Sequence, residues 1–219
     1  MNDDTLIGGS GGDTMYGGLG NDSVAAGDGS DTILFSSGSD SLSGGAGIDT
    51  LDLSGLKLGA LADLGVASTA VAGTDISAIS EIENIVRSNF DDVLKDSEGS
   101  NVINAGKGDD FIDGGAGDDT IVGGDGNDTI ALSAGDDVID AGDGYDTLTV
   151  NASMADFTLD IVQASTGATL HSLAGTYDNS DIAGIEEIKF SDGSLFISAD
   201  GSTITGDGND NALNISASG

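Results

Sequence analysis

Large aliphatic side chains recur every nine residues along two stretches of this chain, with small and polar residues between them. In the first stretch they are Leu6, Met15, Val24, Ile33, Leu42 and Leu51. In the second they are Leu94, Ile103, Ile112, Ile121, Ile130, Ile139 and Leu148. A fixed internal period is typical of a repeat architecture, in which each unit is one small supersecondary element stacked on its neighbours.

The repeating unit reads Gly-Gly-x-Gly-x-Asp-x-U-x, where U is the large aliphatic residue at position eight. Nearly perfect copies are Gly8–Tyr16, Gly17–Ala25, Gly44–Asp52 and Gly114–Val122, and Gly123–Ala131 follows the last of these without a gap. Thirteen copies are in phase, counting a truncated first one that ends in Asp4-Thr5-Leu6. The truncated copy indicates a segment of a longer array.

Each part of the unit has a structural consequence. Positions seven to nine are long enough for a three-residue strand whose position eight points to one face. Glycines at positions one, two and four permit positive φ and allow backbone carbonyls to crowd inward. Strand, turn, strand and turn then form one coil, which predicts an all-β solenoid with two repeats in each coil.

Position six carries an acidic residue in every copy except one, where it is asparagine. These candidate metal ligands are Asp4, Asp13, Asp22, Asp31, Asp40, Asp49, Asp92, Asn101, Asp110, Asp119, Asp128, Asp137 and Asp146. With two repeats in a coil, Asp13 stacks on Asp31, and Asp119 stacks on Asp137. Carboxylates about 4.8 Å apart repel each other unless a cation lies between them. Because Asn101 is neutral, we expect the site of Asn101 with Asp119 to be weaker than the site of Asp119 with Asp137.

The overall charge restricts the partners. The chain has 39 acidic and five basic residues among 219, and its formal net charge is −34. This charge excludes ordinary nucleic-acid binding, which needs basic residues that displace counterions, and it disfavours anionic membranes. No stretch is apolar over the roughly 18 residues of a membrane helix, so no membrane insertion is expected. Without cysteine, a secreted chain needs metal or size for its stability.

The rest of the chain lacks the strict period. We divide it into a first repeat block (1–52), a spacer coil (53–86), a second repeat block (87–149), a β-rich capping subdomain (150–199) and a degenerate repeat tail (200–219). Short strands are expected at 56–58, 62–64 and 76–85 in the spacer. In the capping subdomain we expect strands at 157–162 and 184–190, and a hairpin turn at Ser191-Asp192-Gly193.

The nonapeptide strongly resembles the RTX, or haemolysin-type, calcium-binding repeat, and Ile82-Glu83-Asn84 resembles an element that commonly precedes such a block. The resemblance implies a parallel β-roll, a right-handed β-solenoid, with Ca²⁺ as its cofactor. It also implies that backbone carbonyls of stacked loops complete each calcium cage. The loop residues so implied are Gly8, Ser10, Gly17, Leu19, Gly27, Gly29, Gly106, Gly108, Gly115, Gly117, Gly124, Gly126 and Gly135. From stacked pairs we expect about eight to ten ions.

RTX modules are associated with type I secretion in Gram-negative bacteria, which implies a secreted, extracellular or cell-surface protein. The expected function is a calcium-dependent folding and secretion module, as a monomer. Two alternatives stay open: a polysaccharide-binding module of an extracellular enzyme such as an alginate epimerase, and a spacer of a large adhesin at the cell surface. We expect no catalysis, because His171 has no partners at catalytic spacing and the many equivalent carboxylate pairs indicate metal binding instead.

Overall fold

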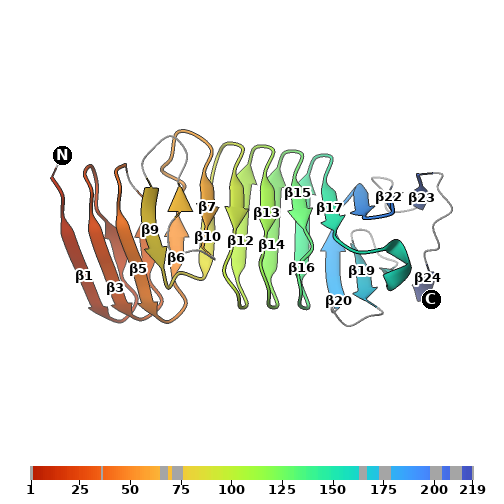
Figure 1. The fold of residues 1–219 in the computed structure, drawn as a ribbon, viewed down its shortest axis with the longest axis horizontal. Coiled ribbons are helices and arrows are strands. Elements are labelled where there is room, and N and C mark those ends of the chain that lie inside the picture. Colours follow the sequence, from red (N-terminus) through yellow and green to blue (C-terminus); the bar gives the residue numbers. More distant parts are fainter. Residues whose placement is uncertain are drawn as a thin grey trace.

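The computed structural model describes residues 2–35, 37–64, 69–70, 76–162, 167–172, 179–197, 204–207 and 214–218. Apart from one 3-10 turn, Met154–Asp156, the elements are all strands. The chain winds as a coil along one long axis, with the N-terminus at one end and the C-terminus at the other (Figure 1). Each repeat strand pairs in parallel with the strand two repeats away, one coil further along the axis. The prediction of an all-β parallel solenoid is confirmed.

Three sheets line the coil. The first has the order β1 (Thr5–Ser10), β3 (Ser23–Asp28), β5 (Ser41–Ala46), β9 (Ile76–Ser80), β8 (Thr69–Ala70). The 11-stranded sheet has the order β2 (Thr14–Tyr16), β4 (Thr32–Leu34), β6 (Thr50–Asp52), β10 (Asn84–Ser88), β12 (Val102–Lys107), β14 (Thr120–Asp125), β16 (Val138–Asp143), β20 (Asn179–Ala183), β19 (Gly167–Ser172), β18 (Phe157–Val162), β24 (Asn214–Ser218). The third has the order β23 (Ile204–Gly206), β22 (Gly193–Ile197), β21 (Glu187–Phe190), β17 (Thr147–Val150), β15 (Thr129–Ala131), β13 (Phe111–Asp113), β11 (Val93–Lys95), β7 (Leu61–Asp63).

The predicted three-residue strand is correct for every second repeat. In the others, such as β3 and β14, the strand runs six residues, from position seven to position three of the next repeat. Pairing continues there because a glycine at position two lies opposite another glycine, as in Gly27 opposite Gly9 and Gly124 opposite Gly106.

Stacked position-eight side chains form the continuous part of the core. Along the 11-stranded sheet one unbroken column runs through Met15, Ile33, Leu51, Ile85, Ile103, Ile121, Ile139 and Ile182. All eight are buried. Burial of one such side chain stabilises the fold by roughly 1.5–3 kcal/mol, so the column supports both repeat blocks.

Between the blocks, the strands of one face of the coil no longer pair in the order in which they follow in the sequence. The strands β9 and β10 pair with β5 and β6, and β10 also pairs with β12, so the 11-stranded sheet passes through without a break. The strand β7 precedes β9 in the sequence but pairs with β11 of the second block. The expected strand at 56–58 is not formed, because the chain turns at Ser54-Gly55 instead.

After Val150 the chain adds strands to both faces. The strands β20 and β21 continue the parallel stacking on β16 and β17, and antiparallel strands follow them. The predicted hairpin turn is confirmed, since Phe190 pairs with Gly193 across two turn residues. The expected strand at 184–190 begins only at Glu187. The ring of Phe157, which is fully buried, lies 5.5 Å from that of Phe190.

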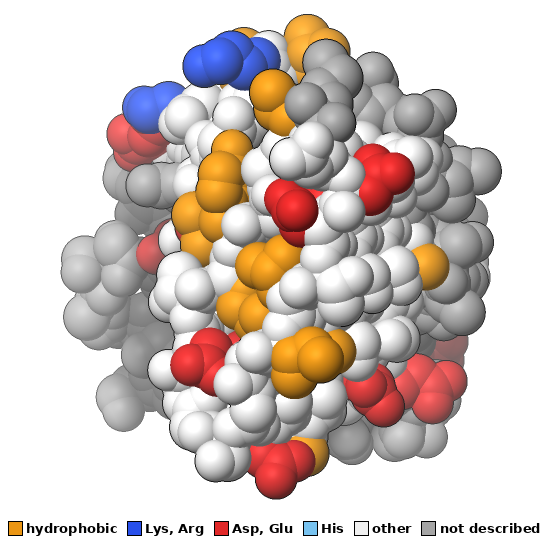
Figure 2. Space-filling model, turned by 90° about the vertical axis from the view of Figure 1, so that its left-hand side faces the viewer, with side chains coloured by type: hydrophobic (Ala, Val, Ile, Leu, Met, Phe, Trp, Pro, Cys, Tyr) orange, Lys and Arg blue, Asp and Glu red, His pale blue; other side chains and the backbone are white. Residues whose placement is uncertain are grey.

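Apolar side chains are exposed at the N-terminal end of the coil. Seen from the N-terminal end, hydrophobic side chains gather across the surface, with acidic side chains around them (Figure 2). Ile7 in β1 and Tyr16 in β2 are among the exposed apolar residues. No helix in the described part of the chain is long and apolar enough to cross a membrane.

Candidate metal centre

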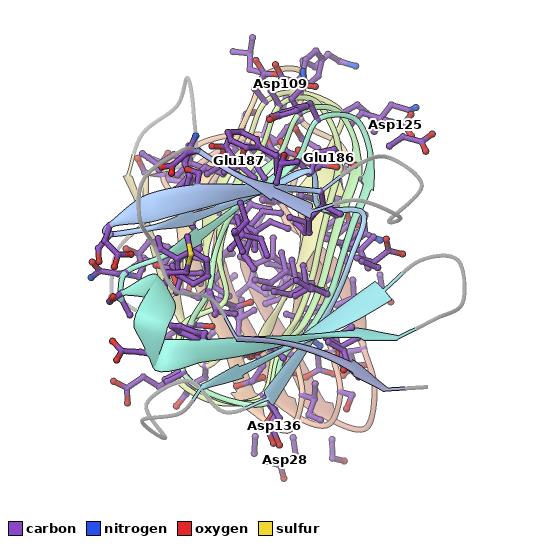
Figure 3. All side chains as sticks on the ribbon, turned by 90° about the vertical axis from the view of Figure 1, so that its right-hand side faces the viewer. Asp28, Asp109, Asp125, Asp136, Glu186 and Glu187 are labelled. Carbon is purple, nitrogen blue, oxygen red and sulfur yellow. The ribbon has the colours of Figure 1, made fainter. Side chains whose placement is uncertain are left out.

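The loops between strands stack along two opposite edges of the coil, and each edge carries a row of position-six residues. The row that precedes the strands of the 11-stranded sheet, here called the long ladder, contains Asp13, Asp31, Asp49, Glu83, Asn101, Asp119, Asp137 and Ser180. The other row, here called the split ladder, contains Asp4, Asp22 and Asp40 in the first block, and Asp92, Asp110, Asp128, Asp146 and Glu186 in the second. Figure 3 looks along the axis: Asp109 and Asp125 mark the edge of the split ladder, and Asp28 and Asp136 mark that of the long ladder.

One hydrogen bond recurs along both ladders. Within each block, the backbone N–H of a position-six residue donates to the Oδ1 atom of the aspartate two repeats later, in nine described pairs. The distance is 2.8 Å from Asp31 to Asp49 and 3.0 Å from Asn101 to Asp119. It is 2.9 Å from Asp110 to Asp128. The predicted stacking of position six is therefore confirmed.

The second oxygen of these carboxylates is buried without a partner. Asp22, Asp31, Asp49, Asp110, Asp119, Asp128 and Asp146 each have a buried Oδ2 atom with no hydrogen bond among the described residues. Their side chains are at most 3% exposed. An unsatisfied buried polar group is costly, and an ionised one is far more so. Rows of such oxygens fit a hard cation, which prefers oxygen ligands.

The described residues contain no group of three or more His, Cys, Asp or Glu that could hold a metal. Backbone carbonyls, which stack from coil to coil, supply further oxygens along each ladder. A side chain on Gly45 or Gly124 would collide with the carbonyl of Gly27 or Gly106 in the coil before it. The chemistry of the donor set is therefore carboxylate and carbonyl oxygen, which suits calcium.

The three glycines of the unit have different roles, which corrects one prediction. Positions two and four have positive φ, as in Gly115 and Gly117. Position one does not adopt positive φ in the described copies. It is glycine because the aspartate of its own loop folds over it: a Cβ atom on Gly44, Gly114 or Gly123 would lie 2.5 Å from the Oδ2 atom of Asp49, Asp119 or Asp128.

The predicted carbonyl donors lie in these stacked loops. Ser10 pairs with Asp28, and Leu19 forms a bridge with Ser37. A Cβ atom on any of the following would collide with the backbone of the glycine two repeats earlier: Gly27, Gly29, Gly117, Gly126 and Gly135. The structure thus brings the predicted carboxylates and carbonyls to the same two edges.

The carboxylates are poorly compensated by other charges. Burial, together with the negative charges of Asp128, Asp92 and Asp91, raises the pKa of Asp110 to about 7. Burial, with Asp137 and other acidic neighbours, raises the pKa of Asp119 to about 7. The described ion pairs of lysine lie elsewhere, on Asp113, Asp125 and Glu187.

Serine at position two satisfies the carboxylate of its own loop in two copies. Ser88 donates its backbone N–H and its hydroxyl group to the carboxylate of Asp92, at 3.1 and 2.8 Å. The Ser133 hydroxyl donates to Asp137 at 3.2 Å. The Oδ2 atoms of Asp92 and Asp137 therefore already have protein partners, unlike the buried Oδ2 atoms of the seven aspartates named above.

Asp96 is a candidate ligand that the repeat pattern did not identify. It occupies position one of the loop that has Asn101 at position six. In this copy the acidic residue therefore stands at position one, where other copies have glycine, and a neutral residue stands at position six. Asp96 is 1% exposed, and its Oδ2 atom has no partner among the described residues. Burial, with the charges of Asp119 and Glu83, raises its pKa to about 8. The site with Asp119 therefore has a second carboxylate nearby, despite the neutral Asn101. The sequence signal was an aspartate in place of a position-one glycine.

The comparison with protein families agrees with this chemistry. A family model described as the RTX calcium-binding nonapeptide repeat matches four times, at residues 2–33, 36–55, 88–121 and 113–148, together just over half of the chain. No curated protein sequence matches. Among solved structures, the chain is similar to the extracellular lipase LipA from Serratia marcescens at 20% identity and a TM-score of 0.35. The match covers 84% of this chain and 38% of the lipase.

Proposed function

The chain belongs to the RTX calcium-binding nonapeptide-repeat family, and from this premise we propose that its two ladders are rows of calcium sites whose filling drives the folding of the roll. The observation that carries the proposal is the row of buried Oδ2 atoms without partners among the described residues. Calcium takes six to eight oxygen ligands, which two carboxylates and the stacked carbonyls of neighbouring loops supply.

The same row explains the coupling to folding. Without cations, the coil would place ionised carboxylates a strand spacing apart in a buried setting, which favours the unfolded chain. Ions that bind only to the folded state add their binding free energy to folding. The buried unpartnered position-six aspartates support about seven sites at one ion each, and the more exposed Asp4 and Asp13 extend the rows toward our expected eight to ten ions.

The biological role follows from affinity. Sites with dissociation constants of about 10⁻⁴–10⁻³ M, typical of extracellular calcium modules, stay empty in the cytosol and fill outside the cell. The chain would then cross the envelope unfolded and fold after export. We assign it as a structural module, without catalysis, of a larger secreted or cell-surface protein.

The direct test combines a metal count with circular dichroism. We expect about eight to ten calcium ions per chain after equilibrium dialysis, and a strand-rich spectrum that a chelator converts into that of an unfolded chain. Magnesium serves as the control, because it requires near-ideal octahedral geometry and keeps several waters. A strand-rich spectrum that persists in excess chelator at low salt and neutral pH would contradict the coupling.

A further inference from the structure

One backbone hydrogen bond fixes the turn of nearly every regular loop. The N–H of the glycine at position four donates to the carbonyl of the position-three residue two repeats later, at 2.5–3.3 Å. The glycines that make this bond are Gly11, Gly20, Gly29, Gly99, Gly108, Gly117 and Gly126. The amide nitrogen of each is thereby occupied by the next coil.

The last loops of the two blocks differ, because no regular loop follows to supply the acceptor. The N–H of Gly144, in the final loop of the second block, donates to no residue that the structure describes. The other glycines of this kind follow serine or alanine in the sequence: Gly38, Gly47 and Gly135. Gly144 alone among them follows an aspartate, Asp143.

The side chain of Asp143 is also available. It lies at the end of β16 and is exposed. Within the described part of the chain its carboxylate makes no hydrogen bond or ion pair. An aspartate followed by glycine is the sequence in which the side-chain carboxyl group is most open to attack by the next backbone nitrogen, because glycine has no side chain that hinders the approach.

Asp28–Gly29 is the matched unit in the first block. Asp28 is exposed as well, and Figure 3 places it at the outer edge of the coil. The backbone at the glycine is similar, since φ is 148° at Gly29 and 155° at Gly144. The two units differ in the amide group: the N–H of Gly29 donates to the carbonyl of Ala46 at 2.8 Å.

In three further Asp-Gly units the carboxylate is occupied. Asp113 accepts the N–H of Gly115 at 3.2 Å, and Asp192 accepts the N–H of Met154 at 2.8 Å. Asp125 forms an ion pair with Lys107. Asp143–Gly144 is therefore the described Asp-Gly unit in which both reacting groups are without a partner among the described residues.

We propose that Asp143 is a modification site, at which the folded chain converts aspartate into isoaspartate. The backbone nitrogen of Gly144 attacks the Cγ atom of Asp143, and the amide proton and a carboxyl hydroxyl group leave as water. The product is a five-membered succinimide ring. Water then opens this ring: cleavage of the new N–Cγ bond restores aspartate, and cleavage at the main-chain carbonyl gives isoaspartate. The reaction consumes only the water that it released.

Isoaspartate at this position would change the last loop of the split ladder. The main chain would become longer by one methylene group, three residues before Asp146. The Oδ2 atom of Asp146 is buried and has no partner among the described residues. We therefore expect weaker calcium binding at Asp146 in the modified chain. This consequence rests on the proposed function, whereas the modification itself does not.

The test compares Asp143 with Asp28 in the same full chain. The chain is incubated with calcium at neutral pH in water enriched in heavy oxygen, and circular dichroism verifies that it is folded. Opening of the ring adds one heavy oxygen atom, which peptide mapping by mass spectrometry locates. We expect about tenfold more label at Asp143 than at Asp28, because at Gly29 a backbone hydrogen bond must open before the attack. A protein isoaspartate methyltransferase then identifies the isoaspartate.

Asp143→Glu is the control variant, because it keeps the carboxylate but needs a less favourable six-membered ring. Label at this position should be lost, and label at Asp28 should be unchanged. After long incubation the calcium midpoint for folding should rise in the unaltered chain and stay constant in the variant. A rise in both would show that modification of Asp143 is not the cause.

The outcomes separate this inference from the calcium function. Equal label at Asp143 and Asp28 in the folded chain, or no label at Asp143, would overturn the modification site. In chelator the two units should react at similar rates, since unfolding releases the N–H of Gly29. If the chain stays folded in chelator, the calcium function fails, and the ratio of label in the folded chain still decides the modification. If Asp143→Glu does not fold, the comparison within the unaltered chain decides.

Discussion

Replacing Asp119 by asparagine should have opposite effects with and without calcium. Asparagine has the same shape, so its Oδ1 atom can still accept the N–H of Asn101, which lies 3.0 Å from Oδ1 of Asp119. It has no charge at any pH. The substitution therefore separates the hydrogen bond of position six from its charge, which is the property that the calcium hypothesis requires.

The magnitude follows from the pKa of Asp119. Burial and acidic neighbours raise it from 3.8 to about 7 in the fold, so the folded chain without calcium binds a proton more tightly than the unfolded chain does. Acid therefore stabilises the calcium-free fold, and this stability is lost as the pH rises from 4 through 7. A shift of roughly three pKa units corresponds to about 4 kcal/mol at most. The asparagine variant cannot ionise at this position, so it does not lose this stability as the pH rises. Its calcium-free fold should therefore persist to a higher pH than that of the unaltered chain.

With calcium the sign reverses. The variant lacks a ligand, and a site filled at one hundred times its dissociation constant contributes about 2.7 kcal/mol to stability. The assay is the folded fraction by circular dichroism, measured against pH in chelator and against calcium concentration at pH 7.5. We expect a higher pH midpoint in chelator and a higher calcium midpoint for folding. Asp118→Asn is the matched control, because Asp118 is exposed one residue earlier. Equal destabilisation with and without calcium would refute the reasoning, since Asp119 would then act only as a hydrogen-bond acceptor.

Three further predictions concern other parts of the roll. Asp96→Asn should raise the calcium needed to fill the site at Asp119, as seen in the calcium midpoint, whereas an unchanged midpoint would mean that Asp96 does not contribute. Gly114→Ala should destabilise the calcium-bound fold by about 1–3 kcal/mol in urea unfolding, because its Cβ atom would lie 2.5 Å from Oδ2 of Asp119. Gly55→Ala, whose Cβ atom would have no neighbour closer than 4.0 Å, should have little effect by comparison. Truncation after Thr149 removes the strands that pair with β16 and β17, so the second block should need more calcium to fold or should associate through its open end. A monomer with an unchanged midpoint would show that the segment 150–199 is independent of the block.

Much of this molecule could be predicted because nine residues determine one strand and one turn. Position eight of each unit faces inward, so the runs Met15 to Leu51 and Ile103 to Ile139 of the column follow from the period. Ile85 joins these two runs only through the pairing of β10 with β6 and β12. The same period places Asp31 on Asp49 and Asp110 on Asp128, because two units complete one coil. The stacking of acidic side chains along the ladders could therefore be predicted from spacing alone, and the resemblance to RTX repeats added the expectation of calcium.

What the period could not predict comes from residues outside it. Glu83 reaches the ladder 34 residues after Asp49, and Glu186 reaches it 40 residues after Asp146, so both depart from the two-repeat spacing. Only the pairing of β10 on β6 and of β21 on β17 brings these side chains to the position-six place.

The local exchanges were also invisible to the pattern. In the sequence, a serine at position two, as at Ser88 and Ser133, resembles a degenerate copy of the consensus glycine. In the fold it donates a hydrogen bond to the carboxylate of its own loop. Asp96 likewise resembles a simple loss of the position-one glycine, but it places a buried carboxylate near Asp119. The sequence by itself determined the coil, the core and the rows of aspartate, because these depend on contacts that repeat with every coil. The tertiary structure decided which oxygens stay without a partner and which residues follow the last aspartate of each block, because these depend on side chains brought together by strand pairing across irregular loops.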